Sequence, residues 1–194
     1  MKRRTFDILV AWAGALLTVV LLGAAGFAYW GYSFANTEVT TQLTAQQIYF
    51  PEEGSPQLDD PRVKPYLAKY AGQQLVTGEQ AKAYADHFIA VHISDMADGK
   101  TYAELGALVR ANPDDTELAQ TRETVFKGQT LRGMLLNAFA FWKIGQLSLM
   151  GAIAAFVAAA VMSVLTVLGF RHARRVSVEE EVFPPKIAVV KQAA

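Results

Sequence analysis

An uncharged apolar stretch over residues 144–170 constrains this chain more than any other feature. Its 27 residues contain no Asp, Glu, Lys, Arg or His. Roughly 20 consecutive apolar residues suffice for an α-helix to cross a bilayer. Because hydrocarbon offers the backbone no hydrogen-bonding partners, a lone stretch of this kind has to form a helix that satisfies its own N–H and C=O groups. The sequence therefore predicts a transmembrane helix over residues 144–170.

A second apolar run covers residues 8–30 and is interrupted only by Thr18. The basic head MKRRT precedes it, and Lys and Arg beside a span are typical of the cytoplasmic side. A cleaved signal peptide with its cleavage site at residues 33–35 is the alternative, but the apolar core of a signal peptide has about 7–15 residues. This run has 23, and its length favours an uncleaved transmembrane anchor.

The two spans predict one consistent topology. Arg171, Arg174 and Arg175 follow the second span and assign that end to the cytoplasm, as the basic head does for the first span. We therefore expect a two-pass protein of the cell membrane with both termini in the cytoplasm. Aromatic rings and a snorkelling Lys suit the headgroup layer at the outer ends of the spans. These membrane-interface anchors are expected to be Tyr29, Trp30, Tyr32, Trp142 and Lys143.

The topology divides the chain into five parts: a cytoplasmic N-terminus (residues 1–7), transmembrane helix 1 (8–30), an extracytoplasmic helical domain (31–143), transmembrane helix 2 (144–170) and a cytoplasmic tail (171–194). The short mixed composition of residues 176–194 predicts a disordered segment. The chain has no Cys, which removes disulfides, thiolate nucleophiles and Cys-ligated metals. Its 18 basic and 18 acidic side chains balance, so no basic domain supports nucleic-acid binding.

Local signals predict a helical domain between the spans. Capping boxes at Thr77 with Gln80 and at Thr101 with Glu104 each begin a helix, because the two side chains satisfy exposed N–H groups of the first turn. The remaining segments are expected as a helix or an extended arm over residues 36–46, an extended piece over 47–50, a loop over 52–61 and a short helix over 62–71.

One long helix is expected from about Asp115 to about Arg171, because no Pro occurs between Thr116 and Pro184. Its first half would lie outside the membrane and its second half would be the second span. The fold class is therefore an all-α membrane protein with two transmembrane helices and an extracytoplasmic α-helical domain, the second span being continuous with a long outer helix.

Small residues recur every fourth position in the second span. This stripe, named the small-residue face, consists of Gly151, Ala155, Ala159 and Ser163. Small side chains let helix backbones approach closely in lipid. The face is expected to pack either against the first span or against another copy or another membrane protein, and the sequence leaves both alternatives open.

The candidates for chemistry are few. His87 and His92 are spaced by five, which places them about 140° apart on a helix, so they do not share a face. We expect no metal site, no cofactor, no catalytic residues and no enzyme activity. A ligand-binding pocket, if the outer helices form one, is expected to be lined by Tyr84, Phe88 and Tyr102.

Six phrases between residue 42 and the second span occur together in one order. They are QLTAQQIYFP (42–51), YAGQQ (70–74), AKAYADHFI (81–89), GKTYAEL (99–105), ANPDD (111–115) and TLRGMLLNAFAFWKIGQ (130–146). Taken together, these phrases resemble a family of small actinobacterial two-span membrane proteins with an outer helical domain, whose members are often labelled "aromatic ring-opening dioxygenase". The resemblance implies the same topology and an envelope setting. It contributes no catalytic residues, because ring-opening chemistry needs iron held by histidines and a carboxylate, which this chain does not offer.

These observations predict a membrane-anchored accessory or scaffold protein that acts by protein–protein interaction. The interaction is expected through the outer helical domain and the small-residue face. The expected partners are the lipid bilayer and either a second copy of the chain or another membrane protein. The alternative is an extracytoplasmic sensor or small-ligand-binding module.

Overall fold

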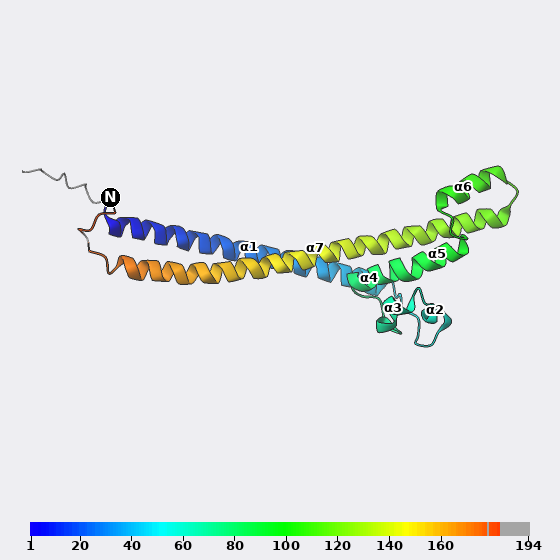
Figure 1. Ribbon diagram of the computed structural model, residues 1–194, viewed down its shortest axis with the longest axis horizontal. Coiled ribbons are helices and arrows are strands. Elements are labelled where there is room, and N and C mark those ends of the chain that lie inside the picture. Colours follow the sequence, from blue (N-terminus) through cyan, green and yellow to red (C-terminus); the bar gives the residue numbers. More distant parts are fainter. Residues whose placement is uncertain (178, 183–194) are drawn as a thin grey trace, which may run out of the picture. The chain divides into compact units, whose positions relative to one another are not determined.

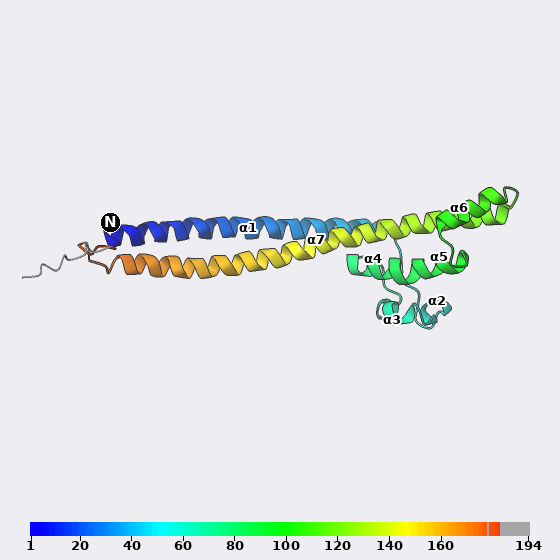
Figure 2. The same ribbon diagram turned by 45° about the horizontal axis from the view of Figure 1, so that its top comes forward.

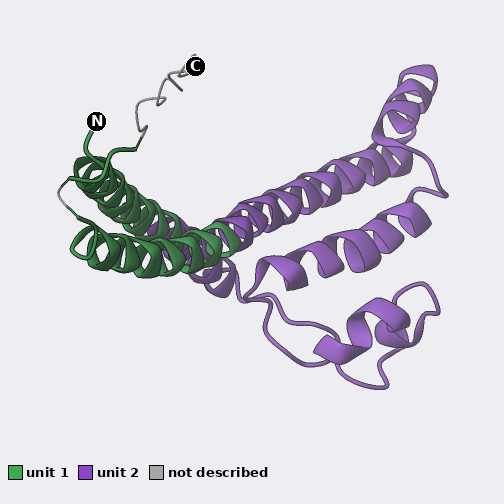
Figure 3. Cartoon of the chain, turned by 60° about the vertical axis from the view of Figure 1, so that its left-hand side comes forward, with its two compact units in different colours: residues 1–29, 149–194 green, residues 30–148 purple. Residues whose placement is uncertain are grey.

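Two long helices dominate the computed structural model, which describes residues 1–177 and 179–182. Helix α1 is Arg3–Ala45 and helix α7 is Thr116–Ala173 (Figure 1). The chain divides into two compact units, drawn in different colours in Figure 3. Unit 1 is Met1–Tyr29 with the described chain from Leu149 onward, and unit 2 is Trp30–Ser148. The predicted long helix is confirmed, and residues 36–45 take the helical alternative.

The facing sides of α1 and α7 in unit 1 are built mainly from small side chains. Figure 2 shows the two helices running side by side here. On each helix the buried and half-buried positions include a run at intervals of three and four, which is the spacing of a coiled-coil seam. A Cβ built on Gly169 would lie 3.5 Å from the Cβ of Ala11, so the backbones approach closely. The seam consists of Asp7, Ala11, Gly14, Thr18, Leu21, Ala25 and Ala28 on α1 and Ala152, Ala155, Ala159, Met162, Thr166, Gly169 and Ala173 on α7.

The outward sides of the same two helices are large, apolar and exposed. Leu16 is 67% exposed on α1, and Phe156 is 62% exposed on α7. Each helix contains an 18-residue window with a mean hydropathy of 2.4, of which only 11% in α1 and 6% in α7 is buried. Both helices are therefore long and apolar enough to cross a membrane. A core helix of a water-soluble protein would instead bury most of such a window.

Unit 2 contains the shorter helices. They are α2 (Pro56–Asp59), α3 (Lys64–Leu67) with a 3-10 turn (Ala68–Tyr70), α4 (Gly78–Tyr84), a π-helical turn (Ala85–Ile89), α5 (Ala90–Met96) and α6 (Tyr102–Ala111). Both predicted capping boxes are present, at the starts of α4 and α6. The loop expected over residues 52–61 is wrong at α2, because Ser55 in an extended conformation followed by Pro56 starts a single helical turn. Tyr49 forms an isolated antiparallel bridge with Gln74, within the piece expected to be extended.

The core of unit 2 is made of large aliphatic and aromatic side chains. Val63, Leu67, Leu75 and Val125 have no exposed surface, and Phe50 is 2% exposed. Because each fully buried side chain of this size contributes about 1.5–3 kcal/mol relative to exposure, the core is the main driving force for folding of this unit.

The segment from α4 to α5 runs antiparallel along α7. A Cβ built on Gly78 would lie 2.3 Å from the Cβ of Trp142, so only glycine fits at that crossing. At the far end, a Cβ on Gly128 would lie 2.7 Å from Cδ1 of Ile93. These contacts hold α4 and α5 against one side of α7 and leave another side of α7 for α1.

The described part of the predicted disordered tail contacts the N-terminus. Within unit 1, the backbone N–H of Arg3 donates to the carbonyl of Glu180 at 2.9 Å, and Val182 N–H donates to the carbonyl of Met1 at 3.2 Å. An ion pair joins the Arg3 and Glu180 side chains. Residue 178 and residues 183–194 of the same predicted segment lie outside the described residues.

Candidate functional site

An apolar groove lies between α1 and α7 in unit 2 and has a volume of about 450 Å³. Its floor is formed by Val39, Leu43 and Leu135, which are 3–5% exposed. Helices α1 and α7 approach closely near Gly145, where a Cβ would lie 3.0 Å from the Cβ of Ala35. The complete lining, named the α1/α7 groove, is Phe34, Glu38, Val39, Gln42, Leu43, Gln46, Ile48, Leu131, Met134, Leu135, Asn137, Ala138 and Phe141.

The walls of the α1/α7 groove expose large apolar side chains. Met134 is 66% exposed, Phe141 54%, Phe34 52% and Leu131 39%. Four lining residues of α7 follow one another at intervals of three, four and three, namely Leu131, Met134, Ala138 and Phe141. They form a second helix-packing stripe beside the side of α7 that contacts α1. Large exposed apolar patches are typical of surfaces that contact a protein, a ligand or a membrane.

Few residues of the lining are polar, and they carry little charge. Glu38 is the single ionisable residue in it, and Gln42, Gln46 and Asn137 supply amide groups. The Gln42 amide donates to the Glu38 carboxylate at 3.4 Å. Amides both donate and accept hydrogen bonds, whereas a carboxylate only accepts. The groove can therefore receive an apolar body that carries amide-like polar groups along one edge.

A charged cluster elsewhere in unit 2 joins the segment between α2 and α3 to α5. The Arg62 guanidinium donates two hydrogen bonds to the Asp95 carboxylate, both at 2.8 Å, and others to Asp60. The hydrogen bonds from Arg62 lower the pKa of Asp60 to about 2 and also lower the pKa of Asp95. The pKa of Arg62 is raised by the same contacts, first by Asp95. All three groups are satisfied by one another, so this Arg62 cluster is a structural clamp.

A second ion-pair cluster lies on the π-helical turn. Asp86 accepts hydrogen bonds from Lys82 at 2.5 Å and from Arg132 of α7 at 3.0 Å. Burial raises the pKa of Asp86, but the hydrogen bonds from Lys82 and Arg132 outweigh it and the pKa is lowered overall. Arg132 thus connects α7 to the middle of the segment between α4 and α5.

The two histidines of the helical segment face different partners, as their spacing indicates. The His87 ring stacks on Tyr66 with centroids 3.5 Å apart. His92 Nδ1 lies 2.9 Å from the Phe88 carbonyl oxygen, and its ring packs on Phe88. Within residues 1–177 and 179–182, no three His, Asp or Glu side chains gather at a distance suited to a metal ion.

The small-residue face belongs to unit 1 and is partly buried there. Ala159 has no exposed surface, Ala155 is half-buried in the seam with α1, and Ser163 is half-buried beside the seam. Gly151 is exposed, and a Cβ built there would meet nothing within 4 Å. Ala155, Ala159 and Ser163 therefore contribute to packing within the chain. Contact of this face with another protein stays a prediction.

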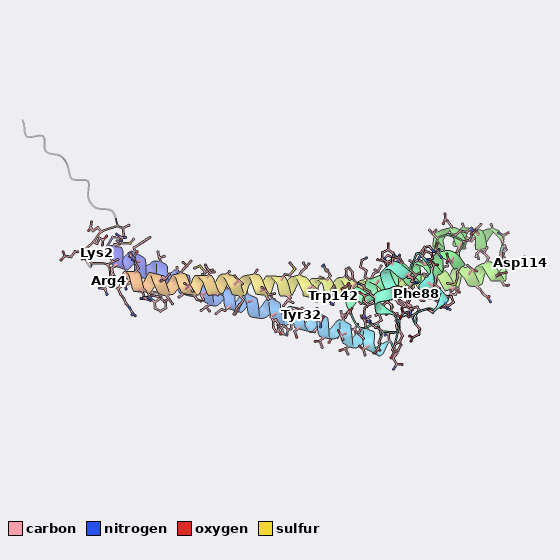
Figure 4. All side chains as sticks on the ribbon, turned by 60° about the horizontal axis from the view of Figure 1, so that its bottom comes forward. Lys2, Arg4, Tyr32, Phe88, Asp114 and Trp142 are labelled. Atoms are coloured by element: carbon pink, nitrogen blue, oxygen red, sulfur yellow. The ribbon has the colours of Figure 1, made fainter. Side chains whose placement is uncertain are left out.

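The expected membrane-interface anchors differ in exposure. Tyr29 and Trp30 are each 59% exposed, and Lys143 is also exposed, whereas Tyr32 is half-buried. Trp142, which is labelled in Figure 4, is half-buried. It packs on Gly78 and, with ring centroids 6.1 Å apart, on Phe139. Trp142 is thus a packing residue of unit 2, a role that the sequence did not indicate.

Of the three aromatic residues expected to line a pocket, Tyr84 and Phe88 come together and Tyr102 lies elsewhere. Tyr84 packs on Phe50 and Phe88, with ring centroids 5.4 and 4.7 Å apart. Tyr102 packs on Phe126 of α7 instead. The α1/α7 groove was not predicted, although the intervals of Leu131, Met134, Ala138 and Phe141 could have indicated a second apolar stripe.

The groove combines exposed apolar walls, a closed floor and one polar edge, and the charged clusters nearby are internally paired. No protein-family model, no curated protein and no solved structure matches the chain.

Proposed function

We propose that this chain is a two-span protein of the cell membrane, with its termini in the cytoplasm and unit 2 on the extracytoplasmic side. The exposed apolar sides of α1 and α7 in unit 1 support insertion, because water-soluble proteins rarely expose apolar patches of this extent. Basic residues at the ends of both apolar runs support the orientation. The resemblance of residues 42–146 to two-span actinobacterial proteins agrees with this proposal.

Its function is that of an accessory or scaffold protein that binds another protein through unit 2. The α1/α7 groove is the observation that carries this proposal. Phe34, Met134 and Phe141 are more than half exposed there, outside the stretch proposed to lie in lipid. Burial of large exposed aromatic side chains is what drives most specific protein–protein contacts.

A ligand-binding module is the second candidate, and the size of the groove favours it. A volume of about 450 Å³ falls within the range typical of small-molecule sites, about 300–1,000 Å³. An apolar ligand could occupy the same surface. The two functions differ in the molecule that is lost when the groove is disrupted. An accessory protein would lose a protein partner, and a ligand-binding module would lose a small molecule.

The test is the native size of the full-length protein in a mild detergent. Phe141→Ser disrupts the groove, and Phe126→Ser is the matched control, because Phe126 is a similarly exposed phenylalanine on the same helix (50% against 54%) outside the groove lining. We expect a complex larger than the monomer for the wild type and for Phe126→Ser, and loss of that complex for Phe141→Ser.

A wild-type protein that runs as a monomer would contradict the proposed accessory function. A small molecule that is extracted in stoichiometric amount from the wild type and from Phe126→Ser, but not from Phe141→Ser, would support the ligand-binding function instead of the accessory function. Failure of the chain to appear in the membrane fraction would overturn the membrane assignment itself.

A further inference from the structure

We propose that a cleft in unit 1 binds a small aliphatic amine, with the ammonium group of the ligand on the Asp7 carboxylate. This cleft, named the Asp7 cleft, is lined by side chains from residues 6–14 of α1 and residues 162–172 of α7, and its volume is about 300 Å³. All of its lining belongs to unit 1, whereas the α1/α7 groove belongs to unit 2. The inference therefore goes beyond the proposed function and does not rest on it.

Two buried polar atoms of the Asp7 cleft have no hydrogen-bond partner among the described residues. They are Oδ2 of Asp7 and Oγ1 of Thr166. Buried polar atoms in native proteins are nearly always partnered, and an isolated buried charge is the most costly to leave alone. Because a carboxylate only accepts hydrogen bonds, the missing partner of Asp7 is a donor. A donor that carries positive charge offsets the carboxylate best.

The basic side chains of the described chain do not supply this donor. His172 is the one basic residue in the described lining of the cleft. Its Nε2 lies 3.8 Å from Oδ2 of Asp7, which is beyond hydrogen-bond distance, and its side chain is 58% exposed. Arg3, one turn before Asp7, pairs with Glu180 instead. The Asp7 side chain is only 20% exposed, so it faces the cleft without a cation of its own.

The remaining walls of the Asp7 cleft are apolar. Val10 and Met162 lie along its length, and Gly14 keeps its far end open. A Cβ built on Gly14 would lie 2.6 Å from Oγ1 of Thr166, so a larger residue would crowd that hydroxyl. Asp7 and Gly14 are two turns apart on α1, which is roughly 10 Å. The cleft thus has a carboxylate at one end, an apolar middle and a hydroxyl at the other end.

This arrangement matches an aliphatic amine better than water. A volume of about 300 Å³ is at the lower limit of small-molecule sites and far exceeds the space of one water. Water would satisfy the hydrogen bond of Asp7 but would leave its charge uncompensated and the apolar walls wet. An ammonium group with an unbranched apolar body compensates the charge and covers the walls in one molecule.

The test is calorimetric titration of the full-length protein with octylamine in a mild non-ionic detergent. 1-Octanol is the ligand control, because it has the same apolar body and no charge. Asp7→Asn keeps the shape of the side chain and removes its charge. Glu179→Gln is the matched control, since Glu179 is an exposed carboxylate of unit 1 that does not line the cleft. Partition of octylamine into the micelle is the same for every variant.

We expect the wild type and Glu179→Gln to bind octylamine with the same dissociation constant. Asp7→Asn should raise that constant at least about tenfold, because it removes a hydrogen bond to a charged group. 1-Octanol should bind the wild type at least about tenfold more weakly than octylamine, a comparison that needs no variant.

The lipid that co-purifies with the protein distinguishes two sources of the same chemistry. A phospholipid with an ethanolamine head group also carries a primary ammonium on an apolar body. Its retention by the wild type and Glu179→Gln, with depletion in Asp7→Asn, would identify a membrane lipid as the ligand. Octylamine binding that depends on Asp7, without such a difference in lipid content, would identify a free amine.

Three results would overturn the amine site. The first is a wild type that neither binds octylamine nor retains the ethanolamine phospholipid through Asp7. The second is equal affinity of the wild type and a folded Asp7→Asn for octylamine, with circular dichroism as the measure of folding. The third is equal affinity of the wild type for octylamine and 1-octanol. None of them depends on the native size of the protein, which tests the proposed function separately.

Discussion

Unit 1 and unit 2 share the same two long helices, α1 and α7, yet their interiors use side chains of different size. In unit 1 the seam contains Ala11, Ala159 and Gly169, and in unit 2 the core contains Leu67, Leu75 and Phe50. In water, burial of large apolar side chains drives packing. In lipid that driving force between helices is missing, and close approach of small residues replaces it. The contrast agrees with the proposal that unit 1 lies in lipid and unit 2 in water.

The contrast predicts that truncation is harmful in unit 2. Leu75→Ala removes a side chain with no exposed surface, and we expect it to lower the free energy of unfolding by about 2–5 kcal/mol, because it removes buried surface and leaves a cavity. Leu108→Ala is the control, since Leu108 is 38% exposed and should tolerate the change. Thermal unfolding of the full-length protein in mild detergent, followed by circular dichroism, measures both. Equal loss in the two variants would break the assignment of Leu75 to the core.

Enlargement is expected to be harmful in unit 1. Ala159→Leu inserts a large side chain where no surface is exposed, and we expect a loss of about 1–3 kcal/mol from overpacking. Its neighbour Ala160 is exposed, so Ala160→Leu is a control of the same chemistry and should have little effect. The midpoint of thermal unfolding in detergent compares them. A tolerated Ala159→Leu would show that α1 does not approach α7 at this point.

The same experiment sharpens the role of the small-residue face. Gly151 is exposed with nothing near its Cβ, so Gly151→Leu should not lower the thermal midpoint. If Gly151→Leu alters the native size of the protein instead, the exposed part of the face contacts another molecule.

The helix caps of unit 2 are expected to contribute less than its core. Thr101→Ala removes one half of the capping box of α6, where the Thr101 hydroxyl accepts from the Glu104 N–H at 3.3 Å. We expect a loss of about 0.5–2 kcal/mol. Thr124→Ala is the control, because the Thr124 hydroxyl donates only to the Gln120 carbonyl within α7. Faster amide hydrogen exchange confined to α6 in Thr101→Ala would support the cap, and unchanged exchange there would contradict it.

The smallest expected effect concerns pH. Hydrogen bonds from Arg62 lower the pKa of Asp60 from its ordinary value of 3.8 to about 2, and the pKa of Asp95 shifts in the same direction. As the pH falls, Asp60 therefore binds its proton in the unfolded chain before it does so in the folded chain. The stabilisation of the folded state by the ionised Asp60 is complete above pH 3.8 and is lost towards pH 2. Arg62→Gln should flatten the acid dependence of stability in this window. An unchanged acid dependence would show that the Arg62 cluster is not formed in solution.

Local signals predicted much of the fold. The capping residues Thr77 and Thr101 lie within three residues of the groups they satisfy, and the long Pro-free segment predicted α7 directly. Helix α2 was missed because Ser55 and Pro56 are typical of loops as well as of helix starts. The π-helical turn has no comparable signal in the sequence.

The site could not be predicted in the same way, because it depends on contacts between distant segments. Phe34 and Met134 are about 100 positions apart, and only the packing of α1 on α7 makes them walls of one groove. Trp142 was expected at a membrane interface from its composition alone, whereas its packing on Gly78 depends on where α4 lies. Sequence patterns indicate which side of a helix is apolar and leave open what covers that side.

The most direct test of the two-span topology is the side of the membrane on which each unit can be labelled. Glu123→Cys places a single thiol on unit 2, and Arg174→Cys places one beyond the end of α7. In intact cells, a membrane-impermeant maleimide should label the Glu123→Cys variant at once and the Arg174→Cys variant only after the membrane is permeabilised. Labelling of Arg174→Cys in intact cells, or protection of Glu123→Cys from the reagent until permeabilisation, would contradict a two-span topology with cytoplasmic termini.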